Sequence, residues 1–193
     1  MKKRHRIGNI DVSKLEYRQE LFFSLFCDNF KPVNTLPIRK HEIDFPNGRS
    51  DFYLLKVPRS DNQANLFRLE ILTNGSLPLN KVQNRFFKRT TGIFFCASEQ
   101  SVTSGSGNYI DTIRDTLKKL ISEYPLRYPL WEVIILLPQN VEQSIIHQIS
   151  EGYDKLVKIK AHLYPAGTGS IIEVIYEYLL DMKDLSHHSA LKQ

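Results

Sequence analysis

The spacing of apolar and polar residues predicts a helix near the start of the chain. Ser13 stands at the N-cap position of a capping box, and Glu16 is the residue that would reach back to it. Apolar side chains then recur at helical spacing and include Phe22 and Phe26. We therefore expect the first element to be a helix over residues 13–29.

Three extended segments follow this predicted helix. Residues 38–45 are amphipathic, and a Pro-Asn-Gly turn signal at 46–48 separates them from a mostly apolar run at 50–57. In residues 66–73 apolar and polar side chains alternate, which is the period of a strand. The three segments predict a meander of neighbouring strands.

The rest of the chain alternates between predicted helices and strands. We expect a helix over 78–91, a buried strand over 92–97 and a Ser/Gly-rich loop over 98–108. Further helices are expected at 109–123, 140–152 and 170–183, with strands at 131–138 and 157–164. This order predicts an α/β fold with a mixed sheet, in a single domain that spans residues 1–193.

The composition is that of a folded protein. Of its 193 residues, 41% are hydrophobic and 24% are charged, which is enough apolar surface for a packed core. Cys27 and Cys96 lie in apolar runs, so we expect buried free thiols and a reducing, cytoplasmic environment. No apolar stretch approaches the ~18 residues of a transmembrane helix, and no apolar signal segment follows the basic residues 2–6. We therefore expect no membrane partner.

Three short motifs, SKLE ending at Glu16, RSD ending at Asp51 and LEIL around Glu70, resemble those of the PD-(D/E)xK nuclease-like superfamily. The sequence SKLE ending at Glu16 resembles the acidic first-helix motif of the end-cleaving endonuclease subunits of bacterial transposases. The sequence RSD ending at Asp51 resembles the Pro-Asp of the second strand, and LEIL around Glu70 resembles the Glu-x-Lys of the third. The run from Glu70 to Lys81 is also similar to plasmid replication-relaxation and mobilisation proteins. The resemblance implies a restriction-endonuclease-like core (αβββαβ) over 13–97 and an αβαβα extension over 108–184.

Phosphodiester hydrolysis explains why two carboxylates on neighbouring strands matter. A divalent cation polarises the phosphate and lowers the pKa of the attacking water, and Mg²⁺ prefers oxygen ligands. We expect Asp51 and Glu70 to bind Mg²⁺ or Mn²⁺, with the carbonyl oxygen of Ile71 as a third ligand. Glu16 would complete the acidic cluster from the packed helix.

One position departs from the superfamily pattern in a way that affects the chemistry. Leu72 stands where the resemblance requires the lysine that orients the nucleophile. We expect Lys81, on the following helix, to supply the missing cation, and Arg68 is another possibility.

Each acidic residue also has a simpler interpretation. Glu16 could serve only as a capping-box residue, and Asp51 could simply end the preceding turn. Glu70 could form a surface ion pair with Arg68 or Lys56. These alternatives stay open on the sequence alone.

A group of basic residues on the helix expected at 78–91 predicts contact with a polyanion. Lys81, Arg85, Lys88 and Arg89 fall at helical spacings of 0, 4, 7 and 8, and we call this group the basic stripe. The net charge of +5 agrees with such a partner but is small. DNA is the partner we expect, and a solvated helix face is the alternative.

Together these features predict a DNA-processing protein of a mobile element, plasmid or defence system. Its expected activity is that of a Mg²⁺-dependent endonuclease. Two alternatives are a degenerate member that binds DNA without cutting it, which Leu72 favours, and a protein-assembly subunit. The assembly subunit would contact a partner protein through the apolar residues 131–180, and a homodimer is also possible.

Overall fold

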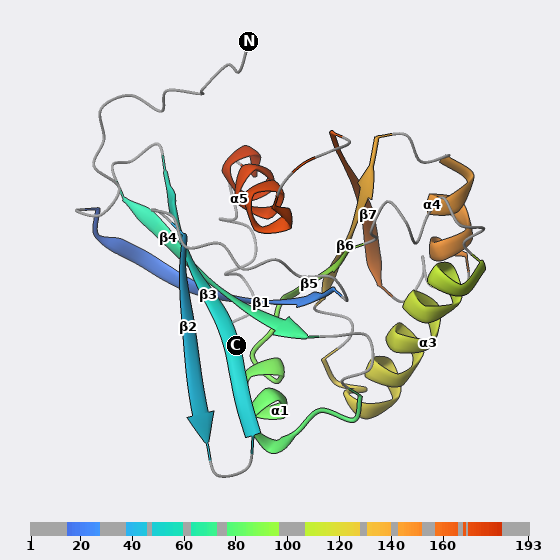
Figure 1. Cartoon of the computed structure of the whole chain (residues 1–193), viewed down its shortest axis with the longest axis horizontal. Helices are drawn as coiled ribbons and strands as arrows, with labels where there is room; N and C mark the ends of the chain where they lie inside the picture. Colours follow the sequence, from blue (N-terminus) through green and yellow to red (C-terminus); the bar gives the residue numbers. More distant parts are fainter. Residues whose placement is uncertain are drawn as a thin grey trace.

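A computed structural model describes most of the chain as an α/β protein (Figure 1). The described residues are 15–27, 38–45, 48–59, 63–72, 77–96, 107–127, 131–139, 143–151, 157–165, 168 and 170–182. The basic residues 2–6 and most of the predicted loop at 98–108 lie outside these ranges. The elements are β1 (Tyr17–Phe26), β2 (Ile38–Phe45), β3 (Gly48–Pro58), β4 (Ala64–Leu72), α1 (Lys81–Phe87), β5 (Gly92–Cys96), α3 (Gly107–Glu123), β6 (Glu132–Pro138), α4 (Gln143–Ser150), β7 (Lys158–Tyr164) and α5 (Ile171–Asp181).

The first element is a strand, so the helix predicted over 13–29 is wrong. Tyr17–Phe26 forms β1, which pairs in parallel with both β4 and β5 at the centre of the sheet. The apolar run in this segment is buried because a central strand is covered on both of its faces. Phe23 and Leu25 enter one core while Phe26 enters the other, which is the alternation of a strand.

The sheet has seven strands in the order β2-β3-β4-β1-β5-β6-β7. The predicted meander is confirmed, since β2, β3 and β4 pair antiparallel in sequence order. All other neighbouring pairs are parallel. The N-terminal half therefore begins with four strands, and the αβββαβ order expected for a restriction-endonuclease-like core is not the order found.

Helices cover the two faces of the sheet unequally (Figure 1). Helix α5 packs on one face, over a core that contains Phe23, Phe67 and Phe94. Helices α1, α3 and α4 lie against the other face, whose core contains Phe87 and Trp131. The helices and strands expected in the C-terminal half are confirmed to within a few residues. Within the described ranges, no helix is both long and apolar enough to cross a membrane.

Candidate functional site

The pairing of β3 with β4 decides which side chains share a face. Glu70 lies directly opposite Phe52 in the antiparallel ladder. Successive positions of a strand alternate between the two faces of the sheet, so position 51 falls in the same row as Tyr53 and Leu55. Tyr53 and Leu55 enter the core beneath α5. Glu70 belongs to the opposite row of the sheet, and it lines a pocket with Phe52 and Phe86. The side chain of Asp51 itself lies outside the described part of the structure.

Glu16 and Glu70 lie at opposite ends of the same strand pair. The carbonyl oxygen of Glu16 accepts a hydrogen bond from the amide of Ala64 at 2.9 Å, whereas Glu70 is level with Ser24. On β4, which has no bulge here, six residues separate the levels of Ala64 and Glu70, which amounts to roughly 20 Å. The fold therefore does not bring Glu16 into an acidic cluster with Glu70, and Glu16 cannot cap a helix at this place.

The other two residues of the predicted metal and catalytic site are also placed. Ile71, the expected carbonyl ligand, is level with Leu25 of β1, and its side chain packs against the core beneath α5. Lys81 is the first residue of α1 and is exposed. Among the described residues, Glu16 and Glu70 thus lie at different levels of the sheet, and Lys81 lies at the start of α1.

Glu70 is a buried carboxylate with only 4% of its surface exposed, not a surface residue. It lies on the α1 side of β4, in a pocket also lined by Thr90. The hydroxyls of Ser24 and Thr90 hydrogen-bond to each other at 2.8 Å within this buried region. Arg68, one of its expected ion-pair partners, forms its ion pair with Glu20.

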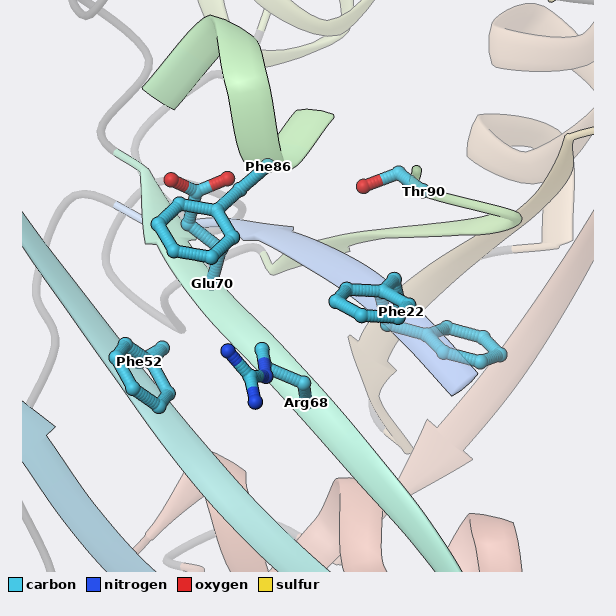
Figure 2. A pocket seen from close by; sticks show the side chains of 7 residues that line it. Phe22, Phe52, Arg68, Glu70, Phe86 and Thr90 are labelled. Atoms are coloured by element: carbon cyan, nitrogen blue, oxygen red, sulfur yellow. The ribbon is translucent and has the colours of Figure 1, made fainter. Parts of the chain in front are cut away.

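Arg68 is the centre of a cluster that the sequence analysis missed. Its guanidinium carbon lies 5.5 Å, 5.0 Å and 5.9 Å from the ring centroids of Phe22, Phe52 and Phe86, and we call these four residues the Arg68 cluster. Figure 2 shows Arg68 between Phe52 of β3 and Phe22 of β1. The guanidinium also donates to Glu20, with Nη2–Oε1 at 2.7 Å and Nε–Oε1 at 3.0 Å. Contacts with three rings and a carboxylate hold this cation in place.

Helix α1 is fixed at its start by its own capping residues. The Asn80 side chain accepts hydrogen bonds from the amides of Val82 and Gln83, both at 2.9 Å. The Gln83 side chain in turn accepts from the Asn80 amide at 3.1 Å, which completes a capping box. Buried Phe87, the last residue of α1, anchors the helix to the core.

The basic stripe is exposed but is not one helical face. Lys81 and Arg85 lie on α1, whereas Lys88 caps the helix and Arg89 follows in the turn, because α1 ends earlier than predicted. All four side chains are exposed, and none forms an ion pair with another residue of the described ranges. The Arg89 guanidinium lies 4.0 Å from the ring centroid of Phe22, which links the stripe to the Arg68 cluster.

Comparison with known proteins adds no family to this description. The chain matches no protein-family model and no curated protein sequence. What the protein does must therefore be inferred from the surface and the site just described.

Proposed function

We propose that this protein is a binding subunit that holds nucleic acid without cutting it. The observation that carries the proposal is the basic stripe, four exposed cations close together in the chain without acidic partners among the described residues. Four like charges repel one another, and a phosphate backbone would neutralise them. Their side chains lie on one short helix and the turn that follows it, so one partner could contact all four.

Cleavage by the predicted acidic pair has less support. A shared Mg²⁺ or Mn²⁺ needs oxygen ligands about 2.1 Å from the ion, so both carboxylates must lie on one face of the sheet. Glu70 pairs with Phe52, so the alternation of β3 argues against a shared face for position 51 and Glu70. The segment predicted as the first helix of the nuclease-like core is the strand β1. The endonuclease activity predicted from the sequence therefore stays an alternative that the same experiment must address.

The binding test measures fluorescence anisotropy of a labelled DNA duplex at two salt concentrations. Four phosphate contacts imply that affinity falls by about two orders of magnitude between 50 and 200 mM salt. The double variant Arg85→Glu/Lys88→Glu should lose most of the low-salt affinity. The matched control is Lys118→Glu/Lys119→Glu, which makes the same charge change on the exposed surface of α3. Equal losses in the two variants, or an affinity independent of salt, would refute the role of the basic stripe.

The cleavage test incubates supercoiled plasmid with the protein and Mg²⁺ or Mn²⁺. We expect no nicking above background. Nicking that disappears in both Asp51→Ala and Glu70→Ala would overturn the non-cutting proposal and restore the predicted endonuclease. Nicking that survives both changes would place catalysis at another site.

A second candidate function, assembly with a protein, is favoured by the Arg68 cluster. Arginine is enriched at the centres of protein interfaces, and 27% of the Arg68 side chain stays exposed above the buried rings of Phe22 and Phe52, next to the exposed Arg89. Light scattering over a range of protein concentrations would detect a homodimer. A dimer that dissociates in Arg68→Ala, in a protein without affinity for DNA, would favour assembly over nucleic-acid binding.

A further inference from the structure

The two cysteines of the chain come together at the carboxyl ends of neighbouring strands. In the parallel pairing of β1 with β5, Phe26 is level with Phe95, so the next residues in register are Cys27 and Cys96. Cys96 ends β5, and Cys27 follows β1 directly. The Cys27 amide donates to the Leu72 carbonyl at 2.9 Å, so the chain continues in the sheet at this residue.

The two thiols also share one face of the sheet. Cys27 follows Leu25 by two residues and Cys96 follows Phe94 by two, and all four belong to the core beneath α5. Side chains in one row of adjacent strands are neighbours, so the thiols lie side by side. No disulfide joins Cys27 to Cys96 in this structure.

The spacing of neighbouring strands is close to the spacing that a disulfide between Cys27 and Cys96 would need. Neighbouring strands lie about 4.8 Å apart, which is within the ~4.4–6.8 Å between Cα atoms that a disulfide spans. The Cβ atoms of level residues keep nearly the same spacing, whereas a disulfide needs them about 3.5–4.5 Å apart. The strand ends must therefore approach by a few tenths of an ångström, and a strained disulfide is reduced more easily than a relaxed one.

Both cysteines keep a small part of their surface exposed where the neighbouring strands β1 and β5 end. Cys96 retains 9% of its surface exposed and Cys27 retains 5%, so a molecule as small as hydrogen peroxide is a better match than a bulky reagent.

We propose that Cys27 and Cys96 form a reversible disulfide that ties β1 to β5 when the protein meets a peroxide. The first thiolate attacks a peroxide oxygen and becomes a sulfenic acid, and the cleaved O–O bond yields one water. The second thiol then attacks the sulfenic sulfur, the S–S bond forms and a second water leaves. Two thiols are thus oxidised while one hydrogen peroxide is reduced to two waters, and an added dithiol reverses the step.

The experiment treats the full chain with hydrogen peroxide and measures its intact mass, its thiol content after denaturation and its tryptic peptides. We expect a loss of about 2 Da and of both titratable thiols, with recovery of both in dithiothreitol. Peptides 19–39 and 90–114, which contain the two cysteines, should be joined when digestion is done without reductant.

Matched variants separate this cross-link from ordinary oxidation. In Cys27→Ser and Cys96→Ser the remaining thiol cannot cross-link within the chain, so peroxide should add oxygen and no mass loss should occur. Cys27→Ala and Cys96→Ala repeat the test with a side chain suited to an apolar core. The wild-type measurements stand even if every variant fails to fold. Two thiols that stay titratable after peroxide, oxygen addition without a cross-link, or disulfides only between chains would each overturn the proposal.

Discussion

Replacing Gly92 by alanine is expected to destabilise the protein because a ring occupies the space that the new methyl group needs. A Cβ at Gly92 would lie 2.1 Å from Cε1 and 2.5 Å from Cδ1 of Phe23, which is level with it on β1. The ring cannot easily move away, since it is buried between Phe67 and Phe94, with centroids 5.6 Å and 5.4 Å distant. Gly92 has no unusual backbone angle, so the cost is steric.

Overpacking of a well-filled core costs about 1–3 kcal/mol, and the lack of free space places Gly92→Ala near the upper end. For a chain of this size, a loss of about 3 kcal/mol lowers the melting temperature by roughly 6–12 °C. Urea denaturation followed by circular dichroism measures the change. In a Phe23→Leu background the same substitution should cost at least about 1 kcal/mol less, because the ring edge is gone. A loss below about 0.5 kcal/mol in the wild-type background would refute the steric argument.

Three further predictions concern the cap of α1, the buried phenols and the Arg68 cluster. Asn80→Ala should cost about 1 kcal/mol and speed hydrogen exchange in α1, whereas Asn80→Asp, which keeps an acceptor oxygen, should cost much less. Burial raises the pKa of Tyr124, Tyr176 and Tyr178 to about 12, so the unfolded chain releases these protons first as pH rises above about 10. Stability should therefore fall between about pH 10 and 12 in urea titrations, and native phenols that titrate near pH 10 would contradict this. Arg68→Lys keeps the charge but not the planar contact with the rings, and it should lower the free energy of unfolding by about 1 kcal/mol.

The sequence predicted most helices and strands correctly where the spacing of apolar residues matched only one kind of element. The alternation in residues 66–73 identified β4, and the turn at 46–48 located the β2–β3 hairpin. It failed at β1 because a continuous apolar run fits a buried helix and a strand covered on both faces equally well. The capping-box pattern at Ser13 and Glu16 then favoured the helix, and pairing with two neighbouring strands overrode that local signal.

The predicted metal site at Asp51 and Glu70 depended on the register between β3 and β4, which the residue patterns of the two strands do not determine. Moving β3 by one residue against β4 would bring the Asp51 position onto the face of Glu70. The alternation within each strand shows which of its own residues share a face, but not which residue of the neighbouring strand stands opposite. The basic stripe was predictable as a set of exposed cations, but the early end of α1 at Phe87 was not. The Arg68 cluster joins three strands and a helix, so no local pattern could reveal it.

The central place of β1 has a consequence for synthesis on the ribosome. This strand is made first, yet its partner β4 begins at Ala64 and its other partner β5 begins at Gly92. At elongation rates of about 5–20 residues per second, Phe26 waits roughly 3–13 s before β5 begins to emerge. Until β4 begins to emerge, after roughly 2–8 s, this very apolar segment has neither neighbour of the finished sheet, so the nascent chain is exposed to aggregation there.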